Sequence, residues 1–224
     1  MEPISFSKFS FDKVNFGNPV KNGDYTIIDI TYDSEFLTVK TPLLEFVTCK
    51  ASMDEQIYAI TSFKDILYNN KTSTFFNFIK DIDNSVIKGC KKNKWFPNKT
   101  KVSFKKSFIK STTLEECLED TNNGWIYPLF KMEASDCDIY NKDRELINID
   151  ELDSINSVRC ILQCDSVWIN KNKFGLNWSI IQMQALNKNK NDENDYMFYD
   201  SDTDDRKCET DYDTDAYATD YVNL

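Results

Sequence analysis

Nine lysines and four aromatic side chains share one short window of the chain, residues 88–110, which contains no Asp or Glu. The lysines are Lys88, Lys91, Lys92, Lys94, Lys99, Lys101, Lys105, Lys106 and Lys110, and the aromatic residues are Trp95, Phe96, Phe104 and Phe108. Lysine side chains neutralise phosphates and release the counterions bound to them. Aromatic rings stack on unpaired bases. The window therefore predicts a surface for single-stranded nucleic acid rather than for duplex, whose bases are already stacked.

The expected contact residues are most of this window and one later arginine: Lys88, Lys91, Lys92, Lys94, Trp95, Phe96, Lys99, Lys101, Lys105, Lys106 and Arg159. Trp95 is the expected stacking residue, because lysines and Pro97 surround it, which is a poor setting for a core strand. The other three tryptophans lie in apolar alternating runs and are expected in the core: Trp125, Trp168 and Trp178. The alternative is a solvated basic surface whose aromatic residues, Phe104 and Phe108 above all, belong to the core.

The second charged feature is an acidic segment, residues 191–224. It holds twelve acidic and two basic side chains, so it carries the net charge of the whole chain, −10, and residues 1–190 are neutral. Such a segment cannot bury enough apolar surface to offset its conformational entropy, so we expect it to be disordered. Blocks of like charge at a terminus are often interaction tails. The residues expected to contact a partner are Asp200, Asp202, Asp204, Asp205, Asp211, Asp213, Asp215, Asp220 and Tyr221.

The tail has an expected target within the same chain. Tethering through a short flexible hinge gives an effective concentration in the millimolar range. We therefore expect the acidic segment to occupy the lysine window when nucleic acid is absent, and to be released for a basic partner when nucleic acid displaces it. The alternative is a solubility tail with no target within the chain.

The sequence offers little support for catalysis. The chain has no histidine, and neither G-x-x-x-x-G-K nor G-x-G-x-x-G occurs. The densest acidic cluster lies in the expected tail, where nothing holds two carboxylates in a fixed geometry. Of seven cysteines, only Cys160 and Cys164 approach zinc-ligand spacing, and both fall on one face of a predicted strand, so core thiols are expected. We therefore expect a protein that is not an enzyme and has no metal or cofactor.

Residues 1–10 lack the apolar region of a secretory signal. No stretch approaches the ~20 apolar residues of a membrane span. An intracellular protein without a membrane partner is expected.

Hydrophobic periodicity predicts a mainly β protein with one inserted helix. Strands are expected over residues 24–32, 36–40, 43–49, 56–66, 101–110 and 125–132, with a hairpin over 157–183. On the first hairpin strand Trp168 has the parity of Cys160 and Cys164 and should face inward. The helix is expected over residues 73–88, with Gly89 as its stop.

About six strands, one helix and a closing hairpin fit an OB-fold-like Greek-key barrel. A β-sandwich fits nearly as well. The expected organisation is a body over residues 1–186, a hinge over 187–190 and a tail over 191–224.

Two motifs and the tail resemble a known family. FDKVNFGNPVKN (residues 11–22), LQCDSVWINKNKFGLNWSIIQMQ (residues 162–184) and the acidic segment are similar to the single-stranded-DNA-binding proteins of nucleocytoplasmic large DNA viruses, relatives of the podophage OB-fold replication protein. The excess of lysine over arginine suits the A+T-rich genomes of such viruses. The resemblance implies coating of single-stranded DNA in replication, recombination and repair, at a viral replication site in host cytoplasm or nucleus. It also implies tail contacts with polymerase and helicase, and a homodimer is left open.

Two functions from other classes remain compatible with the sequence. One is an acidic-tailed interaction protein, such as a chaperone of basic proteins or a DNA mimic without nucleic-acid binding. The other is a virion or scaffold protein. Lysines gathered on one face of the fold would favour nucleic-acid binding, and lysines on opposite faces would weaken it.

Overall fold

The computed structural model describes residues 3–6, 9–51, 56–97, 101–110, 127–186 and 219–223. Its strands are β1 (Val14–Phe16), β2 (Val20–Asn22), β3 (Tyr25–Tyr32), β4 (Glu35–Lys40), β5 (Leu44–Ala51), β6 (Ile57–Ser62), β7 (Lys101–Lys105), β8 (Phe108–Lys110), β9 (Pro128–Glu133), β10 (Asp138–Tyr140), β11 (Ser157–Asn170), β12 (Lys173–Leu186) and β13 (Thr219–Asn223). Its helices are α1 (Asn70–Lys92) and the short 3-10 helices η2 (Phe11–Lys13), η3 (Lys64–Leu67) and η5 (Ile149–Ser154).

Five of the strands close into a barrel. β5 pairs with β6, β6 with β9, β9 with β12, β12 with β11, and β11 returns to β5. All of these pairings are antiparallel except β9 with β12. The exchange of the last two strands relative to chain order gives the Greek-key connectivity of an OB-fold. The predicted OB-fold-like barrel with one inserted helix is confirmed, and the β-sandwich alternative does not hold.

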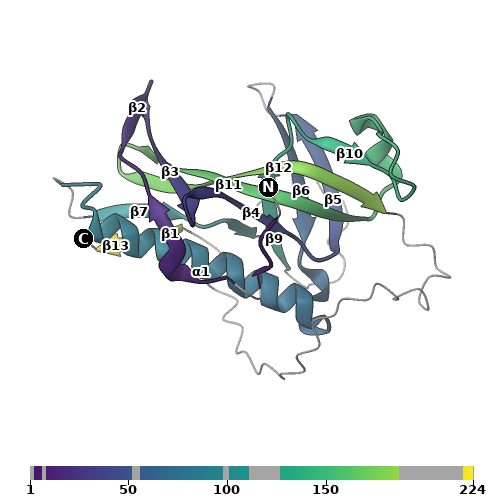
Figure 1. The fold of residues 1–224 in the computed structure, drawn as a ribbon, viewed down its shortest axis with the longest axis horizontal. Coiled ribbons are helices and arrows are strands. Elements are labelled where there is room, and N and C mark those ends of the chain that lie inside the picture. Colours follow the sequence, from purple (N-terminus) through teal and green to yellow (C-terminus); the bar gives the residue numbers. More distant parts are fainter. Residues whose placement is uncertain are drawn as a thin grey trace.

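The β11–β12 hairpin extends beyond the barrel and carries a second part of the sheet. The C-terminal part of β11, residues 166–169, pairs with β3, and β3 pairs with β2. The matching part of β12 pairs with β7, and β7 pairs with β13. Figure 1 shows the long β11 and β12 ribbons running through the molecule, with α1 along one side and the β2–β3 hairpin projecting at one end. The predicted hairpin therefore connects the barrel to the second part of the sheet.

Helix α1 covers one side of this sheet. Its N-terminus is capped by Asn69, whose side chain accepts hydrogen bonds from the backbone N–H groups of Lys71 and Thr72. The apolar residues predicted at helical spacing are all buried: Phe75, Phe76, Ile79, Ile82 and Val86. The predicted stop at Gly89 is wrong, because the helix continues to Lys92. Gly89 is needed for packing instead, since a Cβ there would lie 2.6 Å from the ring of Phe16.

A buried polar network ties α1 to the sheet. Ser107 donates from its backbone N–H and its hydroxyl to the two carboxylate oxygens of Asp83, at 3.0 and 2.6 Å. The indole N–H of Trp178 donates to the Ser107 hydroxyl at 3.2 Å. This network interrupts the single strand predicted over residues 101–110, which is divided into β7 and β8 around Ser107. Trp178, with 4% of its surface exposed, confirms its predicted place in the core.

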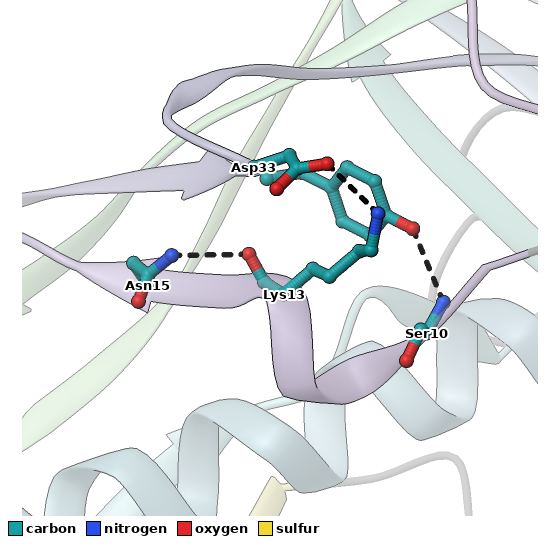
Figure 2. A network of polar contacts seen from close by, with 5 residues as sticks. Ser10, Lys13, Asn15 and Asp33 are labelled. Carbon is teal, nitrogen blue, oxygen red and sulfur yellow. Dashed lines mark hydrogen bonds and ion pairs between the residues drawn. The ribbon is translucent and has the colours of Figure 1, made fainter.

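A second network holds β1 against the turn between β3 and β4 (Figure 2). Lys13 Nζ forms an ion pair with Asp33 Oδ2 at 2.8 Å, and this contact raises the pKa of Lys13. The backbone N–H of Ser10 donates to the Tyr32 hydroxyl at 3.3 Å. The first strand is thereby fixed beside β3, with its Phe16 ring against α1.

Cys160 and Cys164 are buried free thiols, as predicted, and burial raises the pKa of each. Among the described helices, none is both long and apolar enough to cross a membrane. Trp125, Lys99, the predicted hinge and residues 191–218 lie outside the described residues. Of the acidic segment the structure describes only the backbone strand β13.

Candidate nucleic-acid interface

The extended sheet has an inner face toward α1 and an outer face away from it. Buried residues of the paired strands mark the inner face: Ile28 and Ile30 on β3, Val167 on β11, Phe174 on β12 and Phe104 on β7. Because successive strand residues point to opposite sides, their neighbours form the outer face.

Trp168 belongs to this outer face, so its predicted place in the core is wrong. The register of β11 shifts between Cys164 and Ser166, and this bulge reverses the parity of the residues that follow. Trp168 is consequently half-buried, and it stands opposite Ile27 on one side and Gly175 on the other.

The indole of Trp168 lies against Gly175. A Cβ at Gly175 would come within 2.8 Å of Trp168 Cζ2, so any side chain there would displace the ring. The ring of Tyr25, which is 47% exposed, meets the indole edge-on with centroids 6.4 Å apart. Two aromatic rings are therefore accessible on one open sheet surface.

Lysines from three strands lie on the same face. Lys105 pairs with Gly175, and Lys101 shares its parity on β7. Lys173 is exposed two register positions from the Trp168 row, and it therefore shares the face of Gly175. On β9, Lys131 Nζ lies 3.6 Å from the centroid of the Tyr58 ring. Partial burial lowers the pKa of Lys131, and the nearby charge of Lys105 lowers it further.

The rest of the predicted lysine window lies elsewhere. Lys88, Lys91, Lys92 and Lys94 are exposed in or just after the last turn of α1, on the inner side of the sheet. Positive charges at the C-terminal end of a helix also interact favourably with the helix dipole, which stabilises the helix. The lysine window is thus divided between the inner side and the outer face, so it does not by itself form one interface. Its β7 lysines, Lys101 and Lys105, lie on the outer face together with residues from other strands.

The predicted aromatic contacts lie on the inner side as well. Trp95 is half-buried, with its ring 5.3 Å from Phe16 and 6.5 Å from Phe174. Phe96 is only 6% exposed and contacts Phe174, so its ring is not accessible to a base. The expectation that Trp95 stands apart from the core is therefore wrong.

The two remaining predicted contacts are not brought to the outer-face aromatic pair. Lys106 is half-buried beside Ser107. Arg159 lies nine residues from Trp168 along β11, which places it roughly 30 Å away at about 3.3 Å per residue.

The edge of β7 is occupied by the end of the acidic segment. β13 pairs antiparallel with β7, from Thr219 opposite Lys105 to Asn223 opposite Lys101. The strand that carries outer-face lysines is therefore bordered by backbone from residues 219–223.

The barrel and its covering helix define an OB-fold protein. The chain belongs to the family of unknown function DUF5871, whose model matches residues 61–200. This match includes α1, β7, Trp168 and Gly175. No curated protein sequence matches the chain significantly.

The fold is also similar to solved structures of phage proteins. One is a C-terminal truncation of the single-stranded DNA-binding protein from bacteriophage Enc34, with 14% identity, a TM-score of 0.44, and coverage of 80% of this chain and 97% of that one. Another is gp2.5, a single-stranded DNA-binding protein encoded by bacteriophage T7, with 7% identity, a TM-score of 0.41, and coverage of 68% and 87%. A likeness of this strength supports no functional assignment, so the function proposed below rests on the residues of this chain.

Proposed function

We propose that this protein binds single-stranded DNA along the outer face, chiefly through phosphates and base faces, which every DNA sequence presents. The observation that carries the proposal is the indole of Trp168, which lies against Gly175 beside Lys105 on an open face of the sheet that the β11–β12 hairpin carries beyond the barrel. A ring held against a glycine leaves its other side for a base, and base–aromatic stacking contributes about 1–3 kcal/mol.

The lysines around this platform supply the phosphate contacts. Lys101, Lys105, Lys131 and Lys173 come from β7, β9 and β12, the strands on the Gly175 side of Trp168. Stacking on Trp168 requires an unpaired base, which a duplex does not offer without melting. The arrangement therefore favours single strands over duplex.

Salt titration tests this proposal. With about four phosphate contacts, log K for an oligothymidine should fall against log salt with a slope of about −3, from about −0.7 per contact on single strands. The measurement is fluorescence anisotropy of a labelled oligothymidine, with a duplex of equal length as the control. A flat salt response, or a duplex bound as tightly as the single strand, would contradict the proposal.

We further propose that the acidic segment, residues 191–224, competes with DNA and recruits replication proteins such as a polymerase or helicase. The pairing of β13 with β7 supports this, because it brings Asp220 into the strand beside Lys101 and Lys105. We also propose, from the two sequence motifs and the acidic segment, that the chain is related to the single-stranded-DNA-binding proteins of nucleocytoplasmic large DNA viruses.

Truncation after Lys190 should tighten binding of oligothymidine at low salt. An effective concentration in the millimolar range and a self-affinity of similar size would give a gain of about twofold to tenfold. The gain should fade at high salt, where charges are screened. Truncation after Ala218 removes β13 but keeps eleven of the twelve acids, and so separates strand pairing from charge. Unchanged affinity in both variants would leave the acidic segment only a partner-binding or solubility role.

A further inference from the structure

A row of polar residues borders the Trp168 platform on the outer face. Ser166 stands opposite Asp29 on β3 and opposite Asn177 on β12. Asp29 and Asn177 are both exposed. This row is the next one along the strands from the row of Ile27, Trp168 and Gly175.

Strand geometry places Asp29 on the same face as Trp168, one row along the strands. Asp29 alternates with the buried Ile28 and Ile30, so it projects from the same face as Ile27. It is diagonal to Trp168 across the β3–β11 pair, a relation in which residues lie about 7–8 Å apart and long or aromatic groups make contact. The backbone of Asp29 is fixed by a hydrogen bond from Gly17 N–H to its carbonyl oxygen at 2.9 Å.

Both exposed side chains of the row present acceptors. An ionised carboxylate only accepts hydrogen bonds. Asn177 donates from Nδ2 to the Ser166 hydroxyl at 3.1 Å, which fixes its amide. In the described part of the chain, no ion pair involves Asp29. An uncompensated carboxylate on a lysine-lined face weakens phosphate binding, so its presence needs another explanation.

The chemistry of the DNA bases explains a carboxylate at this position. Guanine has two adjacent donors on its Watson–Crick edge, N1–H and the N2 amino group, which match the two oxygens of a carboxylate. Adenine and cytosine each offer one amino group there, and thymine offers one N3–H between two carbonyl oxygens. We propose that Asp29 selects guanine at the position stacked on Trp168. This inference rests on the proposed function, and it adds one discriminating position to a surface that is otherwise indifferent to sequence.

The test compares three labelled oligonucleotides with the full chain. One is all thymidine, one has a single central guanine, and one has hypoxanthine at that place, which keeps N1–H but lacks the N2 amino group. A bidentate contact discriminates by about 1–3 kcal/mol in base recognition, so the guanine oligonucleotide should bind about fivefold or more tightly than all thymidine. Hypoxanthine should lose most of that gain.

Two isosteric variants assign the effect to a residue. Asp29→Asn should abolish the guanine preference and modestly strengthen thymidine binding, because a negative charge is removed. Asp24→Asn is the matched control: Asp24 is exposed beside the same strand but lies off the polar row, so the guanine preference should persist.

The outcomes separate the inference from the function on which it rests. Equal affinities of the unmodified protein for all three oligonucleotides overturn the inference and leave single-strand binding standing. A guanine preference that survives Asp29→Asn overturns the assignment to Asp29. Failure to bind any of the three at low salt overturns the proposed function itself.

Discussion

Trp168→Ala is expected to weaken binding of single-stranded DNA by about 1–3 kcal/mol, which is about 5-fold to 150-fold. The fold should survive, because the indole is only half-buried and lies outside the core. Anisotropy titration measures the affinity, and circular dichroism checks the fold. Trp168→Phe keeps an aromatic ring and should retain part of the affinity.

Trp95→Ala is the matched comparison for this experiment. Trp95 contacts Phe16 and Phe174 on the inner side, so its loss should lower stability and leave the oligonucleotide affinity of the folded protein nearly unchanged. The reverse result, with Trp95→Ala weakening binding and Trp168→Ala neutral, would place the interface at the lysine window as the sequence first indicated.

Trp178→Ala is expected to lower the free energy of unfolding by about 3–5 kcal/mol. The side chain is buried against Phe130, with ring centroids 5.8 Å apart, and its N–H donates to the Ser107 hydroxyl. Urea denaturation measures the loss as a lower midpoint at unchanged slope. Trp178→Phe fills most of the volume but lacks the N–H, so its smaller loss isolates the hydrogen bond. A loss below about 1 kcal/mol for the alanine variant, typical of surface positions, would contradict the described core.

The helix and the hairpin could be predicted because their signals are local. Helical spacing from Phe75 to Val86 and two long β-rich runs around Asn172 need no knowledge of distant contacts. The end of the helix could not be predicted, since the requirement for Gly89 comes from Phe16, a residue far away in the sequence.

The candidate site was only partly predictable for a related reason. Lys92 and Lys105 are near each other in sequence, yet one ends a helix on the inner side and the other lies on an outward-facing strand position. The face of Trp168 depends on a bulge after Cys164 that no residue type announces. One signal was available: a hairpin turning at Lys171–Asn172 places a tryptophan opposite a glycine, which is typical of a ring lying on the sheet.

The pairing of β13 with β7 also bears on how the protein behaves at high concentration. An uncovered edge strand presents a row of unpaired N–H and C=O groups that can template sheet formation between molecules. Residues 219–223 satisfy that row on β7 with backbone from the same chain. β13 then becomes the edge strand of the sheet in place of β7. It is short and contains Asp220, and short, charged edge strands resist intermolecular association. A segment recognised by its charge thus also protects the sheet from aggregation, and any partner or ligand that lifts it must leave β7 covered in another way.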